Sequence, residues 1–139
     1  MEKAKKMAWR LLAASVGLLT LSQLAHADSL DEQRNRYAQI KQAWDNRQMD
    51  VVDQLMPTLS TYPLYPYLQY RQITDDLMNQ PALVVTNFIA ANPTLPPARS
   101  LKSRFVNELA RRSDWRGLLA FSPDKPTGTE AQCNYYYAK

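Results

Sequence analysis

Closely spaced prolines limit this 139-residue chain to short helices. All nine prolines lie between positions 57 and 126, and two of them form the pair Pro96-Pro97. A proline suits the first turn of a helix, where its missing N–H is not needed, but it interrupts a helix further along. Between the prolines, apolar residues recur every three or four positions, as on one face of a helix. Leu101, Phe105 and Leu109 form one such stripe. The sequence therefore predicts an all-α fold built from short helices.

Capping residues and prolines predict where these helices begin. Ser29 to Glu32 has the form of a capping box, and so has Thr129 to Gln132. Pro57 is expected to kink or shorten the second helix, and Asp114 is expected to cap the sixth. The expected helices cover residues 29–45, 49–60, about 63–79, 81–91, 96 to at least 109, 115–121 and a segment from 129 onwards.

Glycine is scarce, and its scarcity argues against two classes of fold. The chain has three glycines, of which Gly117 and Gly128 follow the first 27 residues. It has no glycine-rich phosphate loop, and few positions offer the positive φ that tight hairpins need. Nucleotide binding and an all-β sandwich are therefore not expected. Consecutive short helices with small connections instead predict antiparallel helix pairs stacked in an array, a partial α-solenoid.

The first 27 residues have the pattern of an export signal. Met1–Arg10 is basic, Leu11–Leu21 is apolar, and Ala25-His26-Ala27 is the small-x-small pattern that signal peptidase cuts. Cleavage is expected between Ala27 and Asp28. The apolar run is shorter than the roughly 20 residues of a transmembrane helix, so no stable membrane span is expected after cleavage. An uncleaved N-terminal anchor is the alternative. The chain thus divides into a signal peptide, residues 1–27, and one domain, residues 28–139.

Removing this segment changes the chemistry that the rest of the chain offers. Residues 28–139 contain no histidine, which removes the commonest general base and most zinc sites. The segment holds four of the 17 basic residues and one of the 13 acidic residues, which leaves 13 and 12. The basic balance of the whole chain is therefore no sign of nucleic-acid binding. No metal and no cofactor are expected.

None of the glutamates beyond the signal is expected to be catalytic. Glu32 and Glu130 fall in first helical turns, where a carboxylate favours the helix cap and dipole. Glu108 precedes Arg111 and Arg112 by three and four residues, the spacing of a surface ion pair. Asp75-Asp76 is a carboxylate pair in sequence only, because adjacent side chains diverge by about 100° on a helix. Both aspartates are expected to be solvated.

Cys133 is the only cysteine, and three interpretations of it remain open. It could be a buried small apolar residue. It could be half of a disulfide whose other half lies beyond Lys139, since exported proteins seldom carry a lone thiol. It could also be a reactive thiol, although no histidine or basic cluster lies near it in sequence to lower its pKa.

A basic stretch at residues 99–116 is the one candidate binding surface. It contains six basic and two acidic residues. A basic helix of this kind could contact an anionic polymer such as peptidoglycan or its acidic stem peptides. The alternative is a solvated face opposite the apolar stripe. The candidate glycan-contact residues are Arg104, Arg111, Arg112 and Arg116.

Several segments in order resemble the N-terminal region of the soluble lytic murein transglycosylases of enteric bacteria. The most specific is the run Tyr62-Pro63-Leu64-Tyr65-Pro66-Tyr67. The others are residues 28–34, 37–45, 72–76, 92–97 and 114–121. The resemblance covers essentially the whole chain, including the signal. It implies a right-handed superhelical array of antiparallel helix pairs that begins a long ring-shaped scaffold.

The resemblance also implies an activity, which resides elsewhere in family members. They are periplasmic lyases that cleave the β-1,4 bond between N-acetylmuramic acid and N-acetylglucosamine in peptidoglycan and leave 1,6-anhydromuramic products. One glutamate of a lysozyme-like C-terminal domain acts as acid and then base. It lies in a Glu-Ser motif. No Glu-Ser pair and no Gly-Leu-Met-Gln motif occurs here, so no catalytic residue is assigned.

The sequence is therefore expected to be a non-catalytic N-terminal fragment, truncated after Lys139. Its expected partners are the remaining helical array and the catalytic domain of the same protein, and peptidoglycan strands through that full-length parent. In this interpretation Cys133 pairs with a cysteine further along the parent chain. The alternative is a free-standing periplasmic helical-repeat adaptor that binds another protein.

Overall fold

The structure, a computed structural model, describes residues 28–139. The expected signal peptide, residues 1–27, lies outside the described residues. Between residues 28 and 139 the chain forms seven α-helices and two 3-10 helices and no strand, so the all-α prediction is confirmed. The elements are α1 Leu30–Asp45, α2 Met49–Leu55, η1 Met56–Leu59, α3 Tyr65–Asp75, η2 Leu77–Asn79, α4 Ala82–Ala91, α5 Pro96–Arg111, α6 Trp115–Phe121 and α7 Thr129–Ala138.

Two of the three expected side-chain caps are present. The Ser29 hydroxyl accepts from the Glu32 amide at 3.2 Å, and the Glu32 carboxylate accepts from the Ser29 amide at 2.8 Å. The Asp114 carboxylate accepts from the Gly117 amide at 2.8 Å. The capping box expected at Thr129 is wrong. Gly128, with φ of +90°, is the N-cap of α7, and the Gln132 side chain instead donates to the carbonyl of Pro126 at 3.1 Å.

Local breaks shorten the second and third helices. As expected from Pro57, α2 ends at Leu55 and continues as the 3-10 helix η1. The third helix was expected to reach residue 79, but α3 ends at Asp75. Asp76 leaves the helical region with φ of −135° and ψ of 48°, and its carboxylate accepts from the Asn79 side chain at 2.7 Å. Such a local side-chain bond competes with helix continuation.

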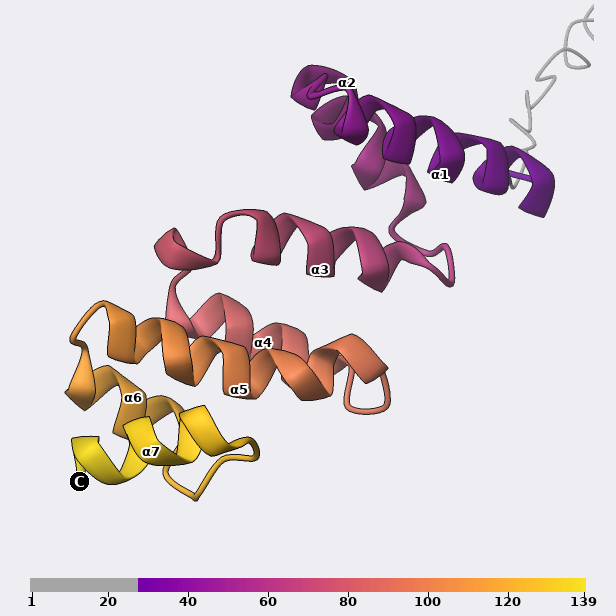
Figure 1. The fold of residues 1–139 in the computed structure, drawn as a ribbon. Helices are drawn as coiled ribbons and strands as arrows, with labels where there is room; N and C mark the ends of the chain where they lie inside the picture. The colour runs from indigo at the N-terminus through magenta and orange to yellow at the C-terminus, as the bar shows by residue number, and fades with distance from the viewer. Residues whose placement is uncertain (1–27) are drawn as a thin grey trace, which may run out of the picture.

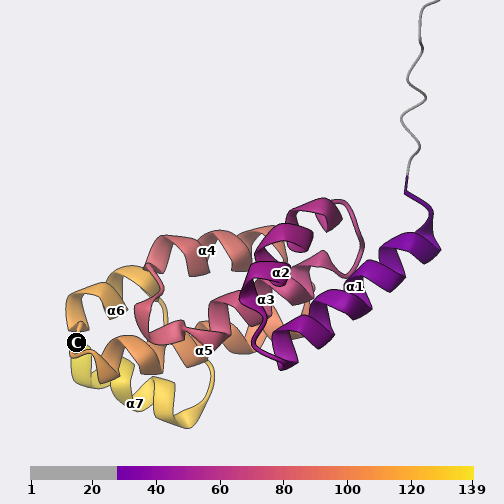
Figure 2. The same ribbon diagram turned by 90° about the horizontal axis from the view of Figure 1, so that it is seen from above.

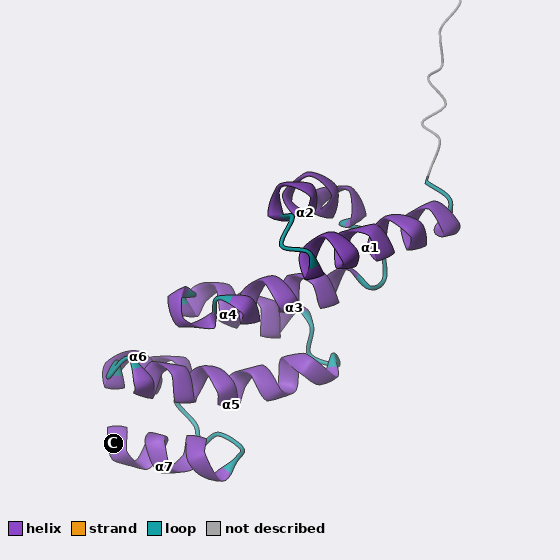
Figure 3. Cartoon of the chain, turned by 45° about the horizontal axis from the view of Figure 1, so that its top comes forward, coloured by secondary structure: helices purple, strands orange, loops and turns teal. Residues whose placement is uncertain are grey.

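The helices follow one another from one end of the molecule to the other (Figure 1). The tier of α1, α2 and η1 comes first, then α3, then α4 with α5, and finally α6 with α7. Short loops connect them (Figure 3). The N-terminal half of α1 projects beyond the other helices (Figure 2). Elements in contact are close in the chain, which is the arrangement of a stacked array.

The buried apolar side chains form two separate cores. The N-terminal core comprises Ile40, Ala43, Trp44, Val52, Met56, Leu59, Tyr62 and Leu68. The C-terminal core comprises Ile73, Val85, Phe88, Ala98, Leu101, Phe105, Val106, Leu109, Leu118, Ala131 and Tyr135. The helix α3 contributes one residue to each, Leu68 to the first and Ile73 to the second. The predicted stripe on α5 is thus confirmed as core.

We expect Phe105→Ala to lower the free energy of unfolding by about 3–5 kcal/mol, the usual cost of emptying a fully buried phenylalanine site. The Phe105 ring has no exposed surface and lies 4.9 Å from the Phe121 ring, centroid to centroid. The control is Leu83→Ala, whose side chain is 68% exposed and should change stability by about 0.5 kcal/mol or less. Urea unfolding followed by circular dichroism measures both. Equal decreases in the free energy of unfolding in the two variants would contradict this account of the core.

Candidate functional site

Two of the four candidate arginines bind segments that are distant from them in the chain. Arg112, which follows the last turn of α5, donates to the carbonyl of Leu77 at 2.5 Å and to that of Gln80 at 3.1 Å. Its guanidinium also lies 5.2 Å from the centre of the Phe105 ring. Arg104 donates to the Tyr70 hydroxyl at 2.6 Å. Both side chains therefore hold α5 to the segment that precedes α4.

The other two arginines point to solvent. Arg111 is exposed at the end of α5, and Arg116 is exposed in the first turn of α6. Arg111 donates to the Glu108 carboxylate at 2.8 Å. Arg116 makes no side-chain hydrogen bond or ion pair within residues 28–139. The four arginines therefore do not present four free guanidinium groups, and glycan contact remains a prediction that fits Arg111 and Arg116 best.

Glu108 is buried, which corrects the expectation of a surface ion pair. Its side chain is 5% exposed, and its second oxygen lies 3.8 Å from Arg112 Nε. Neither that oxygen nor Arg112 Nε has a hydrogen-bond partner among the described residues. The cause is the packing of α5, which contacts α4, α6, α7 and η2 and so buries more than the one face that its apolar stripe marks.

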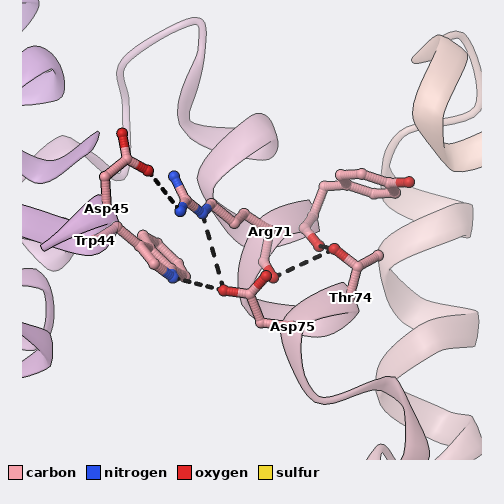
Figure 4. A network of polar contacts seen from close by, with 6 residues as sticks. Trp44, Asp45, Arg71, Thr74 and Asp75 are labelled. Carbon is pink, nitrogen blue, oxygen red and sulfur yellow. Dashed lines mark hydrogen bonds and ion pairs between the residues drawn. The ribbon is translucent and has the colours of Figure 1, made fainter. Parts of the chain in front are cut away.

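Asp75 is also not simply solvated. Its carboxylate accepts from the Trp44 indole N–H at 2.6 Å and lies 3.9 Å from Arg71 Nε (Figure 4). Arg71 donates to Asp45 at 2.8 Å, and its guanidinium lies 5.0 Å from the centre of the Trp44 ring. We call Trp44, Asp45, Arg71 and Asp75 the Trp44–Arg71 network. The sequence held a partial signal for it, since Arg71 and Asp75 are four residues apart on one helix.

The last helix exposes its cysteine. Cys133 is a free, exposed thiol, so the interpretation as a buried apolar residue is wrong. The disulfide and reactive-thiol interpretations stay predictions. Tyr135 is buried and donates to the carbonyl of Pro123 at 3.0 Å, whereas Tyr136 and Tyr137 are largely exposed. The Tyr137 ring lies 4.7 Å from the Trp115 ring.

Charge and burial shift the pKa of two groups near the start of the described chain. A hydrogen bond from Arg36, at 2.6 Å, lowers the pKa of Asp28, the residue expected to follow the cleavage site. Burial, with the nearby Tyr62 and Tyr67 phenols, raises the pKa of Tyr37.

Residues 28–139 could also offer a metal site, a membrane-spanning helix or a surface groove. Residues 28–139 contain no group of three or more side chains of the kind that holds a metal ion. No helix in this range is both long enough and apolar enough to cross a membrane. One shallow groove does include a candidate arginine. It is lined by Asn107, Ala110, Arg111, Trp115, Glu130 and Asn134.

Comparison with known proteins identifies close relatives. The soluble lytic murein transglycosylase of Escherichia coli strain K12 is 81% identical over 139 residues, which is all of this chain and 22% of the relative. The enzyme of the same name from Salmonella typhimurium is 78% identical over the same share of both chains. The chain therefore spans about a fifth of the length of the curated relatives that it matches. No family model matches the chain.

Solved structures agree with the sequence comparison. The crystal structure of the 70-kDa soluble lytic transglycosylase of E. coli matches with a TM-score of 0.79 and 85% identity, over 80% of this chain and 18% of that one. A complex of the 70-kDa soluble lytic transglycosylase with bulgecin A matches equally well. The resemblance seen in the sequence is confirmed.

We expect Glu108→Ala to lower the free energy of unfolding by about 1–3 kcal/mol, because it leaves the partly buried Arg112 guanidinium without its ion-pair partner. Arg34→Ala breaks the ion pair with Asp31, in which the two side chains are 61% and 85% exposed, and should cost about 1 kcal/mol or less. Urea unfolding of both variants tests the comparison. A decrease in the free energy of unfolding in Arg34→Ala as large as that in Glu108→Ala would contradict the burial argument.

Proposed function

We propose that this chain, a homologue of the soluble lytic murein transglycosylases along its whole length, forms the first part of a helical scaffold in such an enzyme. The parent would act in the periplasm on peptidoglycan, cleaving the bond between N-acetylmuramic acid and N-acetylglucosamine to give 1,6-anhydromuramic products. The observation that carries the proposal is the 81% identity over all 139 residues, confined to 22% of the relative.

The described residues support a scaffold role rather than a catalytic one. Glu32 serves the cap of α1, and Glu108 is held by two arginines. Glu130 is exposed in the first turn of α7. A catalytic acid must lie within hydrogen-bond reach of the group that it protonates, whereas Glu32 and Glu108 are engaged by the chain itself.

The stacking of helices in tiers fits a larger superhelix. In a solenoid each unit contacts only its neighbours, so an array grows by adding tiers without changing those already formed. The order of tiers along this chain has that property. We infer that further antiparallel pairs would continue the array as a right-handed superhelix that surrounds the glycan strand, with the catalytic domain beyond it.

Export would place the scaffold in the periplasm. The basic, apolar and small-x-small segments of residues 1–27 support a cleavable signal. Cleavage after Ala27 would leave Asp28 at the new N-terminus, where its carboxylate pairs with Arg36.

A chimera tests scaffold and export together. In it, residues 1–139 replace the matched segment of the E. coli relative, and the protein is produced in E. coli. We expect periplasmic protein whose intact mass corresponds to Asp28 as the first residue. We also expect it to release 1,6-anhydro products from murein sacculi, as shown by mass spectrometry, at a rate comparable to that of the relative.

The controls separate the two halves of the proposal. Residues 28–139 alone should release no such product, and release by them would overturn the non-catalytic role. A chimera that is exported and folded but inactive would overturn the scaffold role. Retention of residues 1–27 in the mature protein would overturn cleavage alone.

The exposed arginines offer a second contact with the substrate. We propose that Arg111 and Arg116 attract acidic groups of peptidoglycan, while Arg104 and Arg112 mainly hold the fold. We expect Arg111→Glu with Arg116→Glu to reduce retention on murein sacculi roughly three- to tenfold at low salt, since an exposed ion pair contributes about 0.2–1 kcal/mol.

The matched control changes charge equally but elsewhere. Arg34→Glu with Arg47→Glu alters two exposed arginines on the first tier. A co-sedimentation assay compares the two double variants. Equal loss of retention in both would mean that net charge, and not this surface, determines binding.

A further inference from the structure

The helix α3 is held firmly by the C-terminal core. Ile73 is part of that core, and the Tyr70 ring lies 6.3 Å from the Phe88 ring. Arg104 of α5 donates to Tyr70, and Arg112, which follows α5, donates to the carbonyls of Leu77 and Gln80 after α3. We therefore group α3 with α4 to α7 and call residues 65–139 the C-terminal body.

The first tier is a second body with its own core. The helices α1 and α2 and the 3-10 helix η1 contact one another and share the N-terminal core. From α3, that core takes Leu68 as a buried residue, and Tyr65 packs against it. Residues 28–62 are therefore the N-terminal body, and the chain crosses from one body to the other at Pro63 and Leu64.

The Trp44–Arg71 network bridges these two bodies at a distance from the crossing. Trp44 and Asp45 end α1, whereas Arg71 and Asp75 lie in the last turns of α3 (Figure 4). Asp75 is seven residues after Leu68, which is about 10 Å along a helix. The helix α3 therefore contacts the N-terminal body at two separate places. One is the apolar contact at Leu68, which we call the pivot, and the other is the network at the C-terminal end of α3.

These two contacts differ in chemistry. Leu68 is buried at the pivot. In the network the side chains are partly solvated, with Arg71 33%, Asp75 52% and Asp45 66% exposed. Partly exposed ion pairs weaken as salt rises, whereas apolar burial does not weaken in this way. An open groove beside the network, lined by Trp44, Asp45, Arg47, Met49, Arg71 and Asp75, leaves room on that side of the joint.

We propose that the Trp44–Arg71 network is a salt-sensitive latch that fixes the angle between the N-terminal body and the C-terminal body. When the latch is closed, the first tier continues the stack. When it opens, the N-terminal body turns about the contact at Leu68 while both cores stay folded. This device is independent of whether the chain contacts glycan, and the proposed scaffold function does not require it.

A distance measurement across the joint tests the latch. One spin label is attached to the native, exposed Cys133 on α7, and the other to Gln39→Cys, an exposed position on α1. Pulsed dipolar EPR then reports the distribution of distances between the two bodies in the full chain. The test variant is Arg71→Met, which removes both ion pairs and keeps a long apolar side chain. The control is Arg34→Met, which removes an exposed ion pair within α1.

The unaltered network should give one narrow distribution at low salt. We expect Arg71→Met to broaden it and shift its maximum, and Arg34→Met to leave it unchanged. Raising the salt from about 0.01 M to about 1 M shortens the Debye length from roughly 30 Å to roughly 3 Å. This change should move the distance distribution of the protein with native Arg71 towards that of Arg71→Met. The same salt change should hardly affect Arg71→Met, because its latch is already lost.

Two results would overturn the latch. One is an Arg71→Met distance distribution that matches that of the protein with native Arg71 at low salt. The other is a distance distribution of the protein with native Arg71 that does not change with salt. Circular dichroism must show that the labelled variants are folded. If Arg71→Met is not, Trp44→Phe takes its place, since it removes the bond to Asp75 and keeps an aromatic ring in the N-terminal core. An unchanged distribution in that folded variant would equally overturn the proposal.

Discussion

Burial of α5 on several sides is the constraint on which most of the molecule depends. Its stripe of Leu101, Phe105 and Leu109 has almost no exposed surface. It is packed against by the helices α4, α6 and α7 and by the 3-10 helix η2. One helix enclosed in this way cannot keep every charged residue at the surface. Glu108 is therefore drawn inside, where its pairing with Arg111 and Arg112 offsets part of the cost of burying a carboxylate.

The position of α3 follows from its own sequence. Leu68 and Ile73 are five residues apart, which places them about 140° apart around a helix. They therefore face different neighbours, and each enters a different core. A helix with a single apolar stripe would serve one core only. The spacing of these two residues thus determines that α3 enters both cores. Pro66, in the first turn, favours the start of the helix at this point.

Sequence reasoning was strongest where local chemistry decides the structure. Ser29 and Asp114 cap helices as expected, and Pro57 ends α2. It failed where distant segments decide. Asp75 accepts a hydrogen bond from Trp44, 31 positions away in the chain. Glu108 is buried by helices whose packing no local sequence pattern reveals. The cap expected at Thr129 failed for a local reason, because Gly128, at positive φ, is the N-cap and Thr129 is the first residue of the helix.

A linear stack also determines how disturbances spread. Because each tier contacts only its neighbours, a loss of packing in one core need not reach the other. The C-terminal core contains the packing around α5, while the N-terminal core rests on α1, α2 and η1. The helix α3 and the polar contacts at its end join the two. Geometry between tiers can therefore change without unfolding either. A scaffold that must fit around a polymer would benefit from that separation, since the fit could adjust at one joint while every tier keeps its own core.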